Sequence, residues 1–179
     1  QIASLTDGRG NVSVQEYDGH DRPVRLRYPN PSGTGTSTTD YEEVAYDATG
    51  NVTSRRNRAG QTTTIAYDNL NRPSSVTPPA GTMGVSLTYD NLGRVLTSTG
   101  GGQTLTNVWD PLSRLTSETG PLGAMSYQYD PAGAMTRITW PDQSYVTYDR
   151  DLYGALTAVR LSSGAALATY AYNDLGLRT

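Results

Sequence analysis

The amino-acid sequence predicts an all-β fold, and three observations support this prediction. The 179 residues include 19 Gly, 10 Pro and 25 Thr, together with 13 Tyr and 2 Trp but no Phe. Threonine and tyrosine favour half-buried pleated surface, whereas glycine and proline favour turns. No stretch of ten residues shows sustained helical periodicity between capping residues. The third observation is a repeat.

An aromatic residue followed by aspartate recurs at intervals of 29, 21, 22, 20, 20, 21 and 22 residues, counting two degenerate copies. A fixed period of this kind is typical of repeat architectures. The repeats begin near residues 17, 46, 67, 89, 109, 129, 150 and 172, so residues 1–179 are one array. An inserted loop at residues 29–40, rich in turn-forming residues, explains the long first interval. The pairs are Tyr17-Asp18, Tyr46-Asp47, Tyr67-Asp68, Tyr89-Asp90, Trp109-Asp110 and Tyr129-Asp130, then the degenerate Arg150-Asp151 and Tyr172-Asn173.

Each repeat carries the elements of a tight hairpin turn, if its aromatic position is numbered 0. An aspartate at position +1 accepts hydrogen bonds from backbone amides two residues on. A residue that tolerates positive φ at position +4 then allows a type I turn to close the hairpin through a bulge. The sequence therefore predicts about sixteen short strands in an up-and-down order. Position +4 is occupied by Gly50, Gly93, Gly133, Gly154 and Gly176, and by Asp21, Asn71 and Ser113.

Sixteen strands spaced by about 4.8 Å would form a sheet roughly 75 Å wide. Open twisted sheets of more than about ten strands tend to curl, so we expect a large curled antiparallel sheet. A propeller is the structural alternative, because two repeats would make a four-stranded blade of about 42 residues. No alternation with that longer period is visible in the sequence.

Two segments carry a family resemblance, Tyr89-Asp90-Asn91-Leu92-Gly93-Arg94-Val95 and Tyr46-Asp47-Ala48-Thr49-Gly50-Asn51-Val52. They resemble the signature of YD repeats, also called Rhs repeats, and eight copies in register extend the resemblance over essentially the whole chain. The family includes the shells of bacterial Rhs polymorphic toxins, the shell subunits of Tc toxins and the barrels of teneurins. The resemblance implies a segment of a hollow β-cocoon, often enclosing a toxic C-terminal domain.

The recurring aspartates are interpreted as turn residues, because a spacing of about one repeat places them along one sheet edge. His20, the only histidine, is interpreted as an exposed turn residue without catalytic or metal-binding partners. Asp7-Gly8-Arg9-Gly10-Asn11 lacks the further ligands of a calcium loop. Asp130-Pro131-Ala132-Gly133 resembles the DPxG element at which some Rhs shells cleave themselves, but it stands in register with the repeat. We therefore expect no catalytic, cofactor-binding or metal-binding residues, and no enzymatic activity.

Charge and hydropathy exclude two classes of partner. The net charge is −3 and the 14 arginines are dispersed, so no basic patch predicts nucleic-acid binding. No apolar stretch approaches the length of a membrane span. The chain begins at Gln1 without an initiator Met or signal peptide, which suggests a piece of a longer protein. Arginine without any lysine, with scarce Ile, is typical of a GC-rich bacterial gene.

These observations predict a structural segment of a large secreted bacterial protein, most simply a polymorphic toxin. Its partners would be the remainder of its own shell and the enclosed C-terminal effector domain. The alternative is an extracellular adhesion or glycan-binding array, in which clustered aromatic rings bind sugar weakly. Fifteen aromatic residues for eight repeats, many of them paired on one strand face, favour packing between repeats over ligand cages.

Overall fold

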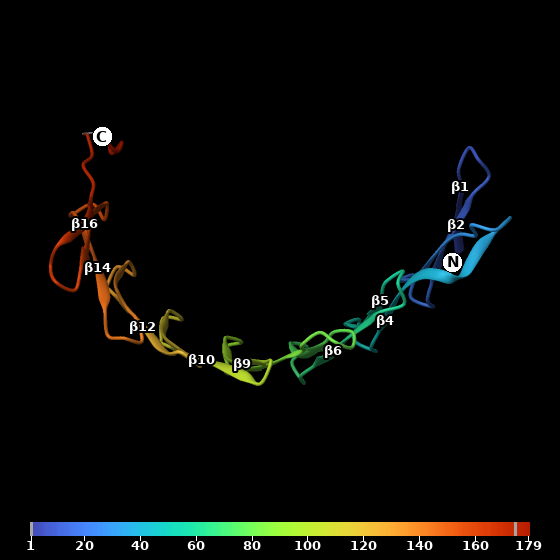
Figure 1. Cartoon of the computed structure of the whole chain (residues 1–179), viewed down its shortest axis with the longest axis horizontal. Coiled ribbons are helices and arrows are strands. Elements are labelled where there is room, and N and C mark those ends of the chain that lie inside the picture. The colour runs from blue at the N-terminus through green and yellow to red at the C-terminus, as the bar shows by residue number, and fades with distance from the viewer. Residues whose placement is uncertain (1, 174) are drawn as a thin grey trace. The chain divides into compact units, whose positions relative to one another are not determined.

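A computed structural model describes residues 2–173 and 175–179, which form strands and turns without any helix. The order of the strands in the sheet is their order in the chain, from β1 to β16. Within each part of the chain, consecutive strands pair antiparallel (Figure 1). The prediction of an all-β, up-and-down fold is therefore confirmed. Across the described residues, no helical segment has the length and apolar character needed to span a bilayer.

The chain divides into two compact units, residues 1–87 and residues 88–179. Strand β8 (Val85–Tyr89) lies at the division between them. The other strands of the first unit are β1 (Ile2–Thr6), β2 (Val12–Tyr17), β3 (Pro23–Pro29), β4 (Thr36–Tyr46), β5 (Val52–Arg56), β6 (Thr62–Tyr67) and β7 (Pro73–Thr77). The second unit holds β9 (Val95–Gly100), β10 (Gln103–Trp109), β11 (Leu115–Gly120), β12 (Gly123–Tyr129), β13 (Met135–Thr139), β14 (Tyr145–Arg150), β15 (Leu156–Leu161) and β16 (Ala166–Thr169).

The two faces of each unit differ in polarity, because side chains alternate along a strand. Paired positions across strands β12 to β15 show this in the second unit. Tyr127, Ile138, Val146 and Leu161 form one continuous row on one face. The neighbouring row on the other face is polar and consists of Gln128, Arg137, Thr147 and Arg160. Each unit therefore has an apolar face and a face rich in Thr, Ser and Arg.

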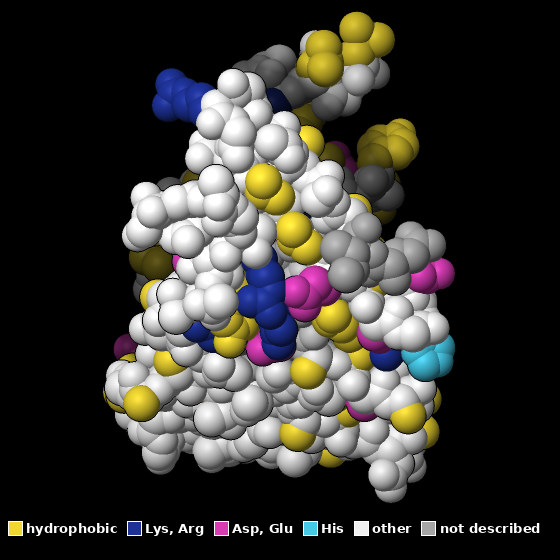
Figure 2. Space-filling view, turned by 90° about the vertical axis from the view of Figure 1, so that its right-hand side faces the viewer, with side chains coloured by type: hydrophobic (Ala, Val, Ile, Leu, Met, Phe, Trp, Pro, Cys, Tyr) yellow, Lys and Arg dark blue, Asp and Glu magenta, His cyan; other side chains and the backbone are white. Residues whose placement is uncertain are grey.

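A closed hydrophobic core is absent from the described residues. Val146 and Ala158 are the only hydrophobic residues there that count as buried, at 7% and 4% exposure, and no side chain is completely enclosed. Hydrophobic side chains instead lie scattered over the viewed surface among polar and backbone atoms (Figure 2). Most strand side chains are half-buried, so each repeat is stabilised by its sequence neighbours, as in other repeat proteins.

The turn predicted at each repeat is confirmed. All eight residues at position +4 have positive φ, from 59° at Asp21 and Asn71 to 94° at Gly50. The register shifts just before the aromatic position, for example between Gln128 and Tyr129, as a bulge requires. The half-interval turn at Asn57–Gln61 has the same hydrogen-bond pattern. Both ends of the hairpins therefore use one turn geometry.

The insertion differs from the loop expected at residues 29–40. The irregular loop is confined to residues 30–35, because Pro29 pairs with Thr36 and extends strand β3. Strand β4 then runs for 11 residues, and its register shifts opposite Arg27 and Pro29. Ser37 is buried within this irregularity, where its hydroxyl accepts hydrogen bonds from the amides of Thr39 and Asp40. The additional residues thus lengthen a hairpin and add a bulge.

Replacing Gly93 by valine should disrupt its hairpin, whereas replacing Asp110 by asparagine should be mild. Gly93 has φ of 83°, and a β-branched residue is strained by roughly 2 kcal/mol in that region. Asparagine keeps an acceptor for both turn amides, and Asn173 already occupies that position naturally with bonds to Leu175 and Leu177. Thermal unfolding followed by circular dichroism compares them, and equal midpoints would contradict the turn assignment.

Candidate functional site

The candidate site is the row of contacts that joins each repeat to the next, which we call the repeat clasp. Its first component is the aspartate at position +1. In the Trp109 repeat, Asp110 Oδ1 accepts hydrogen bonds from the amides of Leu112 and Arg114, both at 2.9 Å. Equivalent bonds bind the amides of His20 and Arg22 to Asp18. The aspartates are therefore engaged within their own turns, as the sequence predicted.

An arginine at position +5 supplies the second component. Arg114 Nε pairs with Asp110 Oδ2 at 2.6 Å, and its Nη1 donates to the carbonyl of Asp130 in the next repeat at 3.1 Å. The same guanidinium lies 4.8 Å from the centroid of the Tyr129 ring. Arg94 repeats this arrangement on Asp110 and Trp109. A single side chain thus contacts its own turn, the next turn and the next aromatic ring.

The aromatic ring at position 0 forms the third component, by donating a hydrogen bond back to the preceding repeat. The acceptor is always the carbonyl at position +6 of that repeat. Tyr129 Oη reaches Leu115 O at 2.9 Å, and Trp109 Nε1 reaches Val95 O at the same distance. Phenylalanine lacks a donor, so its absence from the chain fits this requirement. The other donors and acceptors are Tyr46 to Pro23, Tyr67 to Val52, and Tyr172 to Leu156.

The clasp changes where the repeat is degenerate. Positions +5 of the last three repeats are Ala134, Ala155 and Leu177, which have no guanidinium to reach forward. Arg150 takes the aromatic position and donates to Gly154 O within its own turn. The two buried hydrophobic residues, Val146 and Ala158, lie on the strands flanking this turn. Closer packing therefore accompanies the loss of the arginine contact.

Charged side chains form a network on the polar face of the first unit. Glu16 pairs with Arg25 and with Arg27, and Arg25 also pairs with Glu43. The Arg56 guanidinium lies 3.7 Å from the centroid of the Tyr41 ring. Opposite charges are matched here, so the network stabilises the pairing of strands β2 to β5 and leaves little net charge for a ligand.

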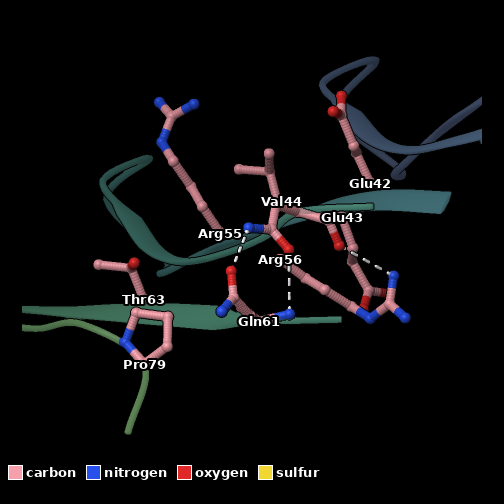
Figure 3. Close-up of a pocket in the computed structure, with 9 residues that line it drawn as sticks. Glu42, Glu43, Val44, Arg55, Arg56, Gln61, Thr63 and Pro79 are labelled. Carbon is pink, nitrogen blue, oxygen red and sulfur yellow. Dashed lines mark hydrogen bonds between the residues drawn. The ribbon is translucent and has the colours of Figure 1, made fainter. Parts of the chain in front are cut away.

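A shallow hollow of about 320 Å³ lies on the opposite face of the same strands. Its lining includes Glu42, Val44 and Arg55, whose side chains project on one side of the strands, with Pro79 beyond them (Figure 3). The side chains of Glu43 and Arg56 project on the other side. Acid and base therefore alternate with apolar groups, and no convergent set of catalytic groups faces the hollow.

Acid should weaken the first unit, because two turn aspartates ionise more readily when folded. Burial opposes ionisation of Asp18, but bonds from the Arg22 amide and guanidinium and from the His20 amide outweigh it and lower its pKa to about 2. The Thr49 hydroxyl, against burial, and then the Asn51 side chain and amide lower the pKa of Asp47 to about 2.

A lowered folded pKa stabilises the fold above the unfolded pKa of 3.8, and this contribution disappears as pH falls towards 2. The thermal midpoint should therefore drop between about pH 4 and pH 2. In a chain carrying both Asp18→Asn and Asp47→Asn, this drop should be smaller. An identical pH profile for the two chains would contradict the assignment.

Other residues singled out by sequence lie in turns or pairs. His20 is exposed in the turn after Asp18. Asp149 pairs with Arg160 at 2.6 Å, whereas Asp151 accepts the amides of Tyr153 and Ala155. Asp7 binds the amides of Arg9 and Asn11 and the Asn11 side chain in an exposed turn.

The Asp130-Pro131-Ala132-Gly133 segment adopts the ordinary repeat turn. The Gly133 amide donates to Asp130 O at 3.0 Å, and Gly133 has φ of 93°. Asp130 Oδ1 accepts the amide of Ala134 at 2.8 Å. Over residues 2–173 and 175–179, no group of three or more His, Cys, Asp or Glu side chains is arranged to hold a metal ion.

A family comparison agrees with the repeat clasp along the chain. The teneurin YD-shell family matches residues 7–177. The chain belongs to this family. Its kinship with the Rhs and YD repeats inferred from sequence is therefore confirmed, and the chain is a structural segment of a YD shell. No curated protein sequence matches it significantly.

Solved structures show the same fold at low sequence identity. A crystal structure of TcdB2-TccC3-Cdc42 superposes with a TM-score of 0.70 at 15% identity, over 99% of this YD-shell segment and 11% of that chain. A Photorhabdus luminescens Tc holotoxin pore carrying a TccC3 mutation gives 0.61 at 20% identity, over 94% and 10%. The segment thus spans about a tenth of the length of these chains.

Sequence reasoning missed two components of the clasp. The first is the forward contact of the arginine at position +5, although Arg22, Arg72, Arg94 and Arg114 recur there in four of eight repeats. The second is the donor on the aromatic ring. The substitution of Tyr by Trp109, with no Phe anywhere, was the available signal, because Tyr and Trp share a ring with a polar hydrogen.

Proposed function

We propose that this YD-shell segment is part of the wall of a secreted bacterial container, which isolates an attached C-terminal effector domain until delivery. The repeat clasp carries this proposal. Each clasp connects a turn, a ring and a strand carbonyl of adjacent repeats, so an array is stabilised without a closed core. A wall one sheet thick follows from such coupling, because every repeat contacts chiefly its neighbours.

The clasp also weakens the alternative of a glycan-binding array. Aromatic cages bind ligands through free ring faces and polar edges. The Trp109 and Tyr129 polar hydrogens are engaged by Val95 and Leu115, and an arginine lies near each ring. These rings are therefore used for packing between repeats. Glycan-array binding that disappears on replacing Trp109 or Tyr129 would favour the alternative instead.

Limited proteolysis of the parent protein tests containment. In the unaltered parent, the C-terminal domain should survive protease while its isolated form is digested. Tyr129→Ala should expose the domain by breaking one clasp, and Tyr129→Phe should have a smaller effect. Digestion of the C-terminal domain at equal rates in the intact parent and in isolation would overturn the proposal. Activity of the C-terminal domain is not needed for this measurement.

A further inference from the structure

The second unit contains a hollow of about 330 Å³ on its apolar face, lined almost wholly by apolar atoms. Leu105 of β10 and Met125 of β12 contribute to its lining, together with Trp140 from the turn after β13. Pro121 and Leu122 add the turn between β11 and β12. Leu122 is 91% exposed and Trp140 is 36% exposed, so apolar surface at this hollow faces solvent.

Two glycines keep this hollow open. A Cβ atom on Gly120 would lie 3.4 Å from Leu105 Cδ1 and would occupy space at the hollow. A Cβ atom on Gly123 would lie only 2.7 Å from Pro141 Cβ, so the turn and Pro141 approach closely because residue 123 has no side chain. Glycine at both positions places the two turns together and leaves the space beside them unfilled.

The hollow has a single ionisable lining residue, Glu118. Across residues 2–173 and 175–179, no group donates a hydrogen bond to its carboxylate or forms an ion pair with it. Three other strand acids, Glu16, Glu43 and Asp149, each pair with an arginine. A half-buried carboxylate without a partner is unfavourable, and a cation relieves that cost.

The surroundings of Glu118 have acceptors but no spare donor. Asn107 is its cross-strand partner, and Asn107 Oδ1 is buried without a hydrogen bond. The Asn107 amide nitrogen already donates to Val95 O. Burial, followed by the charge of Glu118, raises the pKa of Tyr127, which indicates that the negative charge acts across this face. This part of the face is thus complementary to a donor that carries positive charge.

We propose that this hollow binds a basic side chain, preferably arginine, presented by a polypeptide segment that covers the apolar face. The charge of the side chain would pair with Glu118, while its stem would lie against Leu105 and Met125. A guanidinium also stacks on an indole face, which Trp140 offers. A neutral apolar group would leave the carboxylate unpaired, and so charge complementarity selects the occupant. This inference goes beyond containment, because it names a surface and a partner chemistry.

Trp140 allows the test to be read by fluorescence. In a Trp109→Tyr chain, Trp140 is the only tryptophan, and tyrosine keeps the clasp donor that other repeats use. This chain is titrated with a short polar peptide containing one arginine, and with the same peptide containing citrulline, its neutral analogue. The arginine peptide should give a saturable change in Trp140 fluorescence, and the citrulline peptide should bind at least about tenfold more weakly.

Glu118→Gln and Asp142→Asn provide matched variants. Glu118→Gln removes the charge at the hollow and should weaken arginine-peptide binding by about tenfold. Asp142→Asn removes one charge from a nearby exposed turn and should leave binding unchanged, because asparagine retains an acceptor for the Ser144 amide. Equal binding of the two peptides to the unaltered hollow, or no saturable signal, overturns the proposal even if a variant fails to fold. Neither result bears on containment.

Discussion

Gly123→Ala should lower the free energy of unfolding of the second unit by about 3 kcal/mol. Two effects act together at this position. Gly123 has φ of 112°, which strains any residue with a side chain, and its new Cβ would lie 2.7 Å from Pro141 Cβ. Atoms that close must move apart, so either the turn between β11 and β12 or the turn after β13 must shift.

Gly133→Ala is the matched control for the backbone effect. Gly133 has φ of 93°, but nothing lies within 4 Å of the Cβ position. Only strain is introduced there, so the expected loss is about 1 kcal/mol. Urea unfolding of both variants, with equal slopes, measures the difference. Equal losses would show that Pro141 yields without cost and that its contact does not position the two turns.

Tyr129→Ala should lower the free energy of unfolding by about 3 kcal/mol, because the clasp loses a half-buried ring and its donor together. Tyr129→Phe keeps the ring and removes only the hydrogen bond to Leu115 O, so the expected loss is about 1 kcal/mol. The ring also lies beneath the Arg114 guanidinium, and this contact survives in the phenylalanine variant.

Trp109 offers a second comparison that separates the donor from the ring. Trp109→Tyr and Trp109→Phe remove nearly the same volume, but only tyrosine can still donate towards Val95 O. Tyrosine should therefore be the more stable variant by about 1 kcal/mol. Chemical denaturation followed by circular dichroism is the measurement. If phenylalanine matched tyrosine at both positions 109 and 129, the hydrogen bond between repeats would not contribute to stability.

Much of the turn chemistry was predictable because it is local. An aspartate at position +1 and a residue tolerant of positive φ at position +4 act within five residues, so their spacing is visible in sequence. Ser113 illustrates this, since it adopts φ of 63° at a position that five other repeats give to glycine. The insertion was less predictable, because only pairing between Pro29 and Thr36 decides where its loop begins.

Contacts between repeats were harder to anticipate, because they join residues 14 or more positions apart. Arg114 Nη1 meets Asp130 O only when the strands between them pair in the observed register. The same reason hides the unpaired state of Glu118, since its partners are determined by strands on both sides. An acid on a strand has no sequence signal that distinguishes it from Glu16 or Glu43, which each find an arginine.

The sequence by itself determined that this YD-shell segment is built from two-stranded repeats with capped turns, because those features follow from short-range backbone preferences. Its period also identified the family. Only the tertiary structure decided which groups connect one repeat to the next, which face is apolar and where a charge stays unpaired. The physical reason is that strand pairing brings distant residues together, and the pairing register assigns each side chain to a face and to a neighbour.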